Sequence, residues 1–292
     1  MTDQLQIDFD KMMKSLDISK KDIEFKRKYL KKFIECGFPN KRQENWKFLD
    51  INNIIKESIG DLSFFNDYTL PNQIDSSIFV DGLEHNKIIF INGRIEKIDF
   101  NYEDKNKIEI SDEIEKKVLF DNENSLLDLN NALTNKTFKV VIKENYSLKK
   151  PLIIYHSTNE KIKSKNINLR LDFDLEQNSS LRLIDFFTDN VNKNFINILY
   201  NFNLKKDSIL KNYKIDKFIN DNLKYSYNNI DQETNSISET FILSAGSNYF
   251  KNEINCNLKG EYSSAFVNGV FSLKENQQHE IRTTINHLVE NT

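Results

Sequence analysis

The chain has 292 residues, enough for one large domain or two smaller ones. Its 41 lysines and arginines nearly balance its 44 aspartates and glutamates, which argues against a dedicated nucleic-acid-binding protein. Because glycine (7) and proline (3) are scarce while phenylalanine (22) and tyrosine (11) are common, the composition also excludes a linker-rich or disordered chain.

The first residues, MTDQLQIDFDKMM, contain acidic side chains and no long apolar run, so they do not resemble a secretory signal. The two cysteines, Cys36 and Cys256, are too few for a disulfide scaffold and fit a reducing compartment. Apolar blocks such as Ile88–Ile91 are far shorter than the about 20 residues that a membrane span needs. We therefore expect a cytoplasmic protein that binds neither membrane nor nucleic acid.

Residues 1–65 are predicted to form a small helical domain, with a first helix over Gln6–Leu16. Ser19 and Asp22 resemble a capping box at the start of a second helix, and Gly37 followed by Pro39 ends it. The exposed face of this second helix is basic, and its residues are Lys20, Lys21, Arg27, Lys28, Lys31 and Lys32. Such a face is usually only solvated, and docking to an acidic partner is the alternative.

The stretch GFPNKRQENWKFLDI, from Gly37 to Ile51, contains the chain's only tryptophan. We expect a short helix after Pro39 that runs through Trp46 and Phe48. Both aromatic side chains are expected to anchor the helical domain to the rest of the chain by burying apolar area.

Residues 66–136 are predicted to be a mixed connecting region. Asn92-Gly93 lies between two apolar runs, which is the strongest short signal for a β-hairpin. Residues 111–134 are predicted to be helical and end in the sequence LLDLNNAL.

Residues 137–292 alternate between apolar and polar side chains, which predicts strands with one face turned inward. The inward positions of three such strands are Ile167, Leu169, Leu171, Phe173 and Leu175, then Ile196, Ile198, Tyr200, Phe202 and Leu204, then Phe250, Ile254, Cys256 and Leu258. The pairs of strands recur: Ser180, Ser208, Ser236 and Ser264 open second strands at intervals of 28 residues, and alignment on Phe173, Phe202, Ile230 and Leu258 gives 28 or 29.

A two-strand unit that recurs at this length indicates a solenoid with coils about 4.8 Å apart. The alternatives are a parallel β-helix and a meandering antiparallel sandwich, and the constant period favours the β-helix. No long helical segment separates the strands, so a doubly wound α/β fold is not expected. The last unit, EIRTTINHLVENT, stops without a capping helix, from which we expect an incomplete β-helix that is either a fragment or covered by a partner.

Motifs for chemistry are sparse. The glycines are not spaced as a phosphate-binding loop or a dinucleotide fingerprint, so any use of ATP is assigned to another chain. The four histidines, His85, His156, His279 and His287, do not have the spacing of metal ligands, and each is expected to be an ordinary surface or solenoid residue. We therefore predict no catalytic residue and no metal site, and no cofactor-binding residue can be named.

Two further features have alternative readings. Cys256 lies on the inward phase with Ile254 and Leu258, so we expect a buried thiol rather than a cluster ligand or persulfide carrier. Asp172 and Asp174 lie on the outward face of a predicted strand, where β-helix enzymes that cleave pectin carry acidic clusters. A carbohydrate-active β-helix therefore stays open as an alternative, and so does a purely structural solenoid.

The tryptophan stretch resembles the N-terminal signature of the SufB/SufD family of iron–sulfur cluster assembly proteins. The matching positions are Gly37, Pro39, Arg42, Glu44, Trp46, Lys47 and Phe48. LLDLNNAL resembles the family's segment before its β-helix, and FVNGVFSLKENQQHEIRTTINH (Phe266–His287) resembles a later glycine-containing strand, a glutamine-histidine turn and a strand that ends in histidine. The modest helical N-terminus is more similar to SufD than to SufB.

This resemblance implies a helical N-terminal domain, a right-handed parallel β-helix and a C-terminal helical domain. It implies a scaffold subunit without catalysis of its own, which pairs with a SufB-like β-helix protein as a heterodimer and works with a SufC-like ATPase. The complex assembles Fe–S clusters transiently and acquires iron, and this chain would hold no stable cofactor. The family's Cys-Ser-His-Gly stretch and its SufC-docking helices would lie beyond Thr292, so no site residue is carried over for cluster chemistry.

Overall fold

The structure of the chain is a computed structural model that describes residues 2–16, 18–64, 79–113, 124–158, 162–188, 193–216, 220–274 and 276–292. Two helices, α1 (Thr2–Ser15) and α2 (Lys20–Cys36), open the chain. The predicted capping box is confirmed, since the Asp22 amide donates to Ser19 Oγ at 3.2 Å and the Ser19 amide donates to Asp22 Oδ2 at 3.3 Å. The second helix ends at Gly37, whose φ of 70° is open to glycine at little cost.

The segment after α2 is less helical than the sequence predicted. It forms one 3₁₀ turn, η1 (Glu44–Trp46), and then α3 (Ile51–Ile54), which continues into a π-helical turn, η2 (Ile55–Ile59). The single helix expected through Trp46 and Phe48 is therefore wrong. Pro39 blocks continuation of α2, and the Asp50 side chain, which accepts from the Asn53 amide at 3.1 Å, caps a new helix that starts only at Ile51.

The predicted hairpin at Asn92-Gly93 is confirmed. It joins β1 (Asn86–Ile91) to β2 (Arg94–Asp99) in antiparallel pairing, with φ of 55° at Asn92 and 80° at Gly93. Two consecutive positive φ values are what a two-residue hairpin turn of this kind requires, and Asn-Gly supplies them with little strain.

The helix predicted over residues 111–134 is correct only in its last part. Residues up to 113 belong to strand β3 (Ile108–Glu113), which follows a 3₁₀ turn, η4 (Lys105–Lys107). Residues 114–123 lie outside the described part of the chain, and α4 (Ser125–Leu133) covers the predicted LLDLNNAL. β3 pairs antiparallel with β4, and this long-range pairing overrides the weak helical pattern of residues 111–113.

The remaining strands build a parallel β-solenoid, so the predicted fold class of mainly β structure with a helical N-terminal region is confirmed. Its strands are β4 (Thr137–Ile142), β5 (Leu152–Ser157), β6 (Asn166–Leu175), β7 (Ser180–Phe187), β8 (Phe195–Leu204), β9 (Ile209–Asp216), β10 (Asn220–Gln232), β11 (Ile237–Ser244), β12 (Ser247–Leu258), β13 (Ser264–Phe271) and β14 (Gln278–His287).

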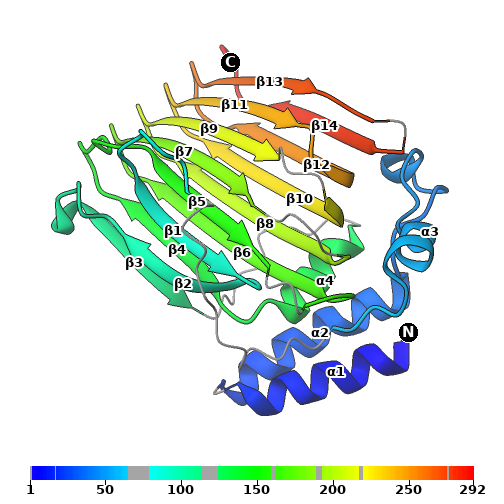
Figure 1. The fold of residues 1–292 in the computed structure, drawn as a ribbon. Helices are drawn as coiled ribbons and strands as arrows, with labels where there is room; N and C mark the ends of the chain where they lie inside the picture. The colour runs from blue at the N-terminus through cyan, green and yellow to red at the C-terminus, as the bar shows by residue number, and fades with distance from the viewer. Residues whose placement is uncertain are drawn as a thin grey trace.

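Each coil contributes one strand to each of two stacked sheets (Figure 1). The first sheet has the order β13-β11-β9-β7-β5-β1-β2, and the second has the order β14-β12-β10-β8-β6-β4-β3. Every pair of neighbouring strands from β4 to β14 within a sheet is parallel. The antiparallel sandwich considered from the sequence is therefore excluded for the described residues.

The repeat length varies slightly around the predicted value. In the first sheet Ser180 pairs with Ile209, Ile209 with Ile237 and Ile237 with Ser264, so the serines chosen from the sequence are not all equivalent. In the second sheet Phe173, Phe202 and Ile230 pair as predicted, but Ile230 then pairs with Cys256 and not with Leu258. The error is two residues because strict alternation fixes which face a residue occupies but not its neighbour along the stack.

A turn motif explains why serine recurs. In successive corners a serine hydroxyl donates to the carbonyl three residues earlier, at 2.6–2.7 Å, and these serines are Ser179, Ser208, Ser236 and Ser263. The residue before each serine has a positive φ, and these residues are Asn178, Asp207, Asn235 and Tyr262. Asparagine and aspartate tolerate this backbone conformation better than most side chains, and three of these four corners have the sequence Asn-Ser or Asp-Ser.

The helical region covers part of the second sheet from outside. Apolar residues of α1, α2 and α4 form one buried cluster with outward side chains of β8 and β10, among them Phe195, Leu199 and Tyr225. The solenoid interior is a separate cluster that runs from Ile88 to Cys256. The second sheet is therefore buried on both faces near the helices, and this junction holds the candidate site.

Candidate functional site

Trp46 joins the helical region to the second sheet. Its side chain is 3% exposed, and its ring centroid lies 5.4 Å from that of Tyr225 on β10. The ammonium group of Lys251, on β12, lies 4.5 Å from the centre of the Trp46 ring and donates to the carbonyl of Asn45 at 2.6 Å. Since a cation over a buried aromatic ring is favourable, Trp46 has the anchoring role that the sequence predicted.

Phe48 does not share this role, and the prediction that it anchors the helical domain is wrong. Its side chain is 69% exposed, whereas Leu49 and Phe38 are buried. Trp46 lies in the 3₁₀ turn and Phe48 just after it, so the two rings do not share one helical face. The Phe48 main chain still contributes, because its carbonyl accepts a hydrogen bond from the Gln278 side chain of β14.

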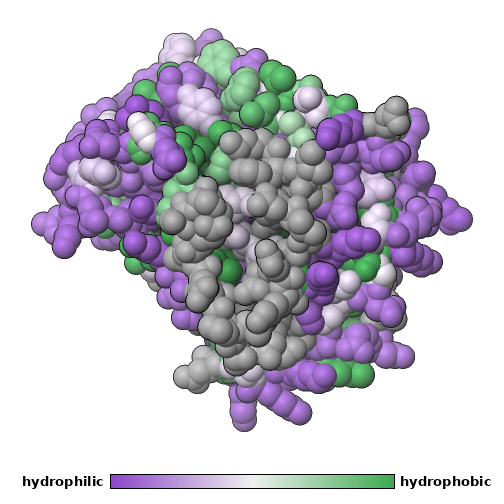
Figure 2. Space-filling model, viewed as in Figure 1, coloured by the Kyte–Doolittle hydropathy of each residue, from purple (hydrophilic) through white to green (hydrophobic). Residues whose placement is uncertain are grey.

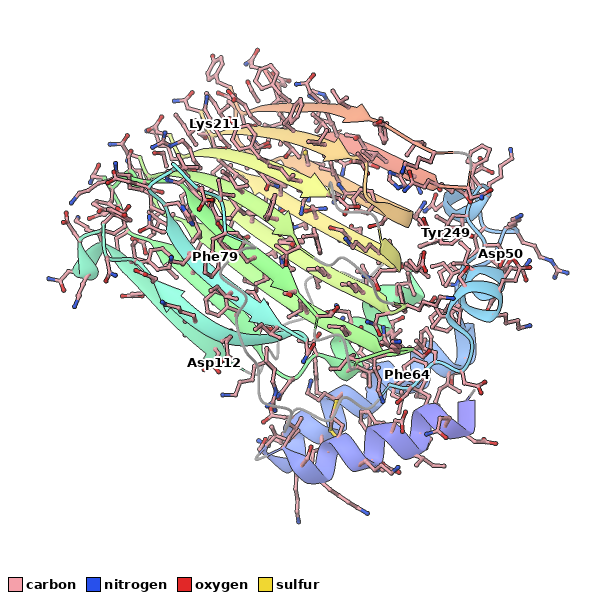
Figure 3. The ribbon with its side chains drawn as sticks, in the orientation of Figure 1. Asp50, Phe64, Phe79, Asp112, Lys211 and Tyr249 are labelled. Atoms are coloured by element: carbon pink, nitrogen blue, oxygen red, sulfur yellow. The ribbon has the colours of Figure 1, made fainter. Side chains whose placement is uncertain are left out.

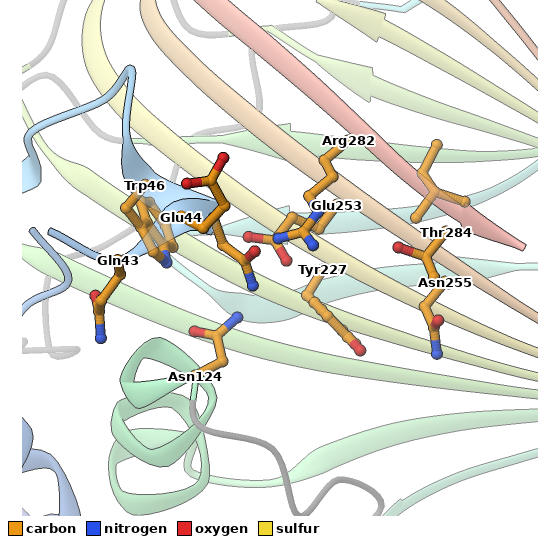
Figure 4. Close-up of a pocket in the computed structure, with 11 residues that line it drawn as sticks. Gln43, Glu44, Trp46, Asn124, Tyr227, Glu253, Asn255, Arg282 and Thr284 are labelled. Carbon is orange, nitrogen blue, oxygen red and sulfur yellow. The ribbon is translucent and has the colours of Figure 1, made fainter. Parts of the chain in front are cut away.

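A pocket of about 390 Å³ opens beside Trp46 (Figure 4). Its floor contains Tyr227, Glu253 and Arg282, which are direct register partners on β10, β12 and β14. The other lining residues are Gln43, Glu44, Asn45 and Trp46 from the segment around η1, Asn124 at the start of α4, and Ile254, Asn255 and Thr284 from the strands. Three chain segments that are distant in sequence therefore meet at one pocket.

The charges of this pocket are incompletely paired. Glu253 is 8% exposed, and neither its Oε1 nor the buried Nη1 of Arg282 has a hydrogen-bond partner among the described residues. Burial raises the pKa of Glu253, although Lys251 and Arg282 oppose the shift. The Glu253 carboxylate has a side-chain hydrogen bond with Tyr225, but a buried charged atom without a hydrogen bond is costly, and Glu253 Oε1 and Arg282 Nη1 are two such atoms.

A second group of charges lies inside the solenoid. Asp185 on β7 is fully buried and accepts from Lys214 Nζ at 2.8 Å and from the Tyr200 hydroxyl at 2.5 Å, while His156 Nε2 lies 2.7 Å from its other oxygen. Burial alone would raise the pKa of Asp185, but Lys214 and His156 outweigh it and hold the pKa below its usual value. Burial lowers the pKa of Lys214, with Asp185 opposing the shift.

A neighbouring cluster continues this polar core toward β12. Asp216 accepts from Lys224 Nζ at 2.9 Å and from the Ser247 hydroxyl at 2.6 Å. Burial would raise the pKa of Asp216, but Lys224 and Ser247 lower it overall. His279 on β14 donates through Nε2 to the Ser247 carbonyl at 2.6 Å, and burial lowers the pKa of this histidine.

The sequence-based reasoning missed these interior charges. Asp185 occupies an inward position of β7 between Leu183 and Phe187, and Lys214 and Asp216 occupy inward positions of β9. A charge at an inward position, paired with an opposite charge about one repeat later, was the available signal. Glu253 and Arg282 gave no such signal, because outward charges are ordinary on a strand.

The remaining two histidines and the two cysteines each include one buried and one exposed side chain. His85 is buried near Tyr155, whose hydroxyl lies 2.9 Å from its Nε2, and His287 is exposed. Within the described part of the chain, no group of three or more His, Cys, Asp or Glu side chains could hold a metal ion. Cys256 is buried in the solenoid as predicted, and burial raises the pKa of its thiol to about 11, whereas Cys36 is exposed.

The outward carboxylates of β6 do not form an open acidic pair. Asp172 is buried beside Arg170, whose Nε lies 3.2 Å from it, and Asp174 is paired with Lys139 at 2.6 Å. The side chain of Asn203 also donates to Asp174, at 2.6 Å. Both carboxylates are thus occupied by partners of this chain, which removes the observation that favoured a carbohydrate-active enzyme.

The end of the solenoid formed by β13 and β14 carries exposed apolar side chains. These are Phe266, Val270, Phe271, Leu273, Ile285, Leu288 and Val289. Figure 2 shows hydrophobic residues gathered toward this end of the visible face. Among the described strands, β13 pairs only with β11 and β14 only with β12, so one edge of each is open to another strand.

None of the helices in the described ranges has the length and apolar character to cross a bilayer.

Comparison with known proteins adds two findings. A family model described as SUF system FeS cluster assembly, SufBD core domain, matches residues 155–292. The chain is also similar to the iron-sulfur cluster assembly protein SufD of Escherichia coli (strain K12), with 21% identity over 274 residues that cover 89% of this chain. The match covers 62% of that protein, so the chain spans less than two thirds of the length of this relative.

Proposed function

We infer that this chain belongs to the SufB/SufD family, most like SufD, and we propose that it serves Fe–S cluster assembly as a scaffold subunit of a SufBCD-type complex. In this proposal a SufB-like protein pairs with the chain, and a SufC-like ATPase supplies ATP hydrolysis. The chain itself performs no catalysis and holds no cofactor stably, while the complex assembles the cluster transiently and acquires iron. We also propose that the complex works in the cytoplasm.

One observation carries the proposal: the residues that match the core-domain model form a parallel solenoid in which β13 and β14, among the described strands, each have one open edge. Main-chain groups on such an edge can bind a strand of a second chain, and the apolar residues beside it can be buried at the same time. A like solenoid is the partner that fits, because its strands would continue both sheets at the same spacing.

Co-expression tests the proposal. The affinity-tagged chain is produced together with SufB-like and SufC-like proteins, and the material retained on the resin is separated by size-exclusion chromatography. We expect one complex that contains all three chains and hydrolyses ATP, whereas the chain alone should show no ATP hydrolysis. Recovery of the chain alone, with both other proteins in the flow-through, would contradict the proposed role.

A matched pair of variants tests the surface. Ile285 on β14 lies beside the open edge and Phe241 lies on the outer face of the first sheet, and both side chains are 39% exposed. We expect Ile285→Asp to reduce recovery of the SufB-like chain at least about tenfold, since a desolvated, unpaired charge at an interface costs about 2–5 kcal/mol. Phe241→Asp should leave it unchanged. Equal recovery with both variants would place the interface elsewhere.

A further inference from the structure

We propose that the pocket beside Trp46 binds a small zwitterion with one carboxylate and one ammonium group, the class to which free α-amino acids belong. The pocket volume of about 390 Å³ lies within the range of about 300–1,000 Å³ that is typical of small-molecule sites. This inference does not rest on the pairing proposed above, because the pocket lies between the η1 segment and the outer face of the second sheet (Figure 4).

Two amide side chains of the pocket, those of Asn124 and Asn255, already have hydrogen-bond partners within the chain. Asn124 donates to the Tyr225 hydroxyl at 2.6 Å and accepts from the Leu126 amide at 3.1 Å. Asn255 donates to Asn229 at 3.2 Å and accepts from the Asn286 side chain at 3.0 Å. Among the described lining residues, the buried side-chain atoms without a hydrogen bond are Glu253 Oε1 and Arg282 Nη1.

Arg282 is the cation of the pocket. Within the described residues its guanidinium group has no hydrogen bond and no ion pair within 4.0 Å, and its Nη1 is buried. A planar guanidinium group binds a carboxylate through two parallel hydrogen bonds, which would satisfy the buried nitrogen. This geometry assigns the carboxylate end of the ligand to Arg282.

Glu253 and Glu44 are the anions. The buried Oε1 of Glu253 has no hydrogen-bond partner, and its nearest cation, Lys251 Nζ, lies 3.9 Å away. Lys251 is itself bound to Glu280 on the adjacent strand and to the Asn45 carbonyl. The Glu44 carboxylate has no partner in the described ranges. An ammonium group bound between these acids would supply the missing hydrogen bonds.

Other ligand classes fit less well. Sugars and nucleobases commonly stack on an open aromatic face, but the Trp46 ring is buried and packed against Lys251 and Tyr225. A phosphate group would face two lining carboxylates, those of Glu44 and Glu253, against one lining cation, Arg282. A zwitterion is the class that meets both signs of charge without adding net charge.

Isothermal titration calorimetry tests the proposal with the chain alone. The probes are a panel of common L-amino acids and, for each one that binds, its N-acetyl derivative and its amide. We expect at least one amino acid to bind, and we expect both derivatives to bind about tenfold more weakly or worse, since each lacks one charged group. No binding by any amino acid, or equal binding of the derivatives, would overturn the proposal.

Variants locate the site. Arg282→Gln and Glu253→Gln should each weaken binding by about tenfold or more, and Arg282→Gln should fold normally because it removes no hydrogen bond or ion pair with a described residue. Lys211→Gln is the control, since Lys211 forms an exposed ion pair with Glu239 at 3.1 Å on the first sheet. In Figure 3 it lies on the opposite side of the view from Asp50 and Tyr249. Wild-type affinity in Arg282→Gln would refute the assignment.

Discussion

Cys36 is exposed and Cys256 is buried, so the two thiols are predicted to differ in reactivity. Burial raises the pKa of the Cys256 thiol to about 11, whereas Cys36 is exposed at the end of α2. Because the thiolate is the reactive form, we expect iodoacetamide at pH 8 to label Cys36 within minutes and to leave Cys256 unlabelled in the folded chain. Peptide mass spectrometry measures the two sites separately.

Unfolding in urea is the control for this experiment, because both thiols should then react at similar rates. Labelling of Cys256 as fast as Cys36 in the folded chain would contradict the burial of β12. The sequence predicted this difference from alternation alone, since Cys256 shares its phase with Ile254 and Leu258. Alternation also places Asp185 in phase with Leu183 and Phe187, but only its pairing with Lys214 on another strand shows how a charge can be buried there.

At the scale of elements, the η1 segment gives a matched pair of aromatic substitutions. Trp46→Ala removes a buried ring that packs on Tyr225 and Lys251, and it should lower the free energy of unfolding by about 3–5 kcal/mol. Phe48→Ala removes an exposed ring and should change it by no more than about 0.5 kcal/mol. Urea unfolding followed by circular dichroism measures both variants.

A similar loss for the two variants would show that the helical region is not anchored through Trp46. From the sequence alone, Trp46 and Phe48 were both predicted to anchor the helical region. That prediction assumed a continuous helix where the chain forms a 3₁₀ turn. The capping box of Ser19 and the hairpin at Asn92-Gly93 were predictable, since each signal is complete within a few residues. β3 was not, because its strand state depends on pairing with β4, more than twenty residues away.

For the whole molecule, the solenoid was predictable from its repeat but its register was not. The interval between coils is set by corners of changing length, so Ile230 pairs with Cys256 and not with the predicted Leu258. The pocket depends on this register, which places Glu253 beside Arg282 on the next strand. A site that needs three coils and the η1 segment could therefore not be found by reading any one segment.

The interior ion pairs link coils, and their removal tests how the solenoid is held together. Asp185 lies on β7 and its partner Lys214 on β9 of the next coil. Asp185→Asn leaves the buried Lys214 without a counter-charge, so we expect the free energy of unfolding at pH 7 to fall by about 3–5 kcal/mol. Asp185→Asn with Lys214→Met removes both charges and should recover most of the loss, as urea unfolding would show.

The pH dependence has a defined sign. The pKa of Asp185 lies below its usual value in the folded chain, while an unfolded aspartate titrates at about 3.9. The stabilisation by this carboxylate is therefore fully present above about pH 4 and is lost as the pH falls toward the lowered folded pKa. We expect the double variant to lose less stability than the wild-type chain between about pH 5 and pH 2. If the free energy of unfolding fell equally with pH in the two proteins, the Asp185–Lys214 pair would make no pH-dependent contribution to stability. The interior charges would then be buried without stabilising the solenoid.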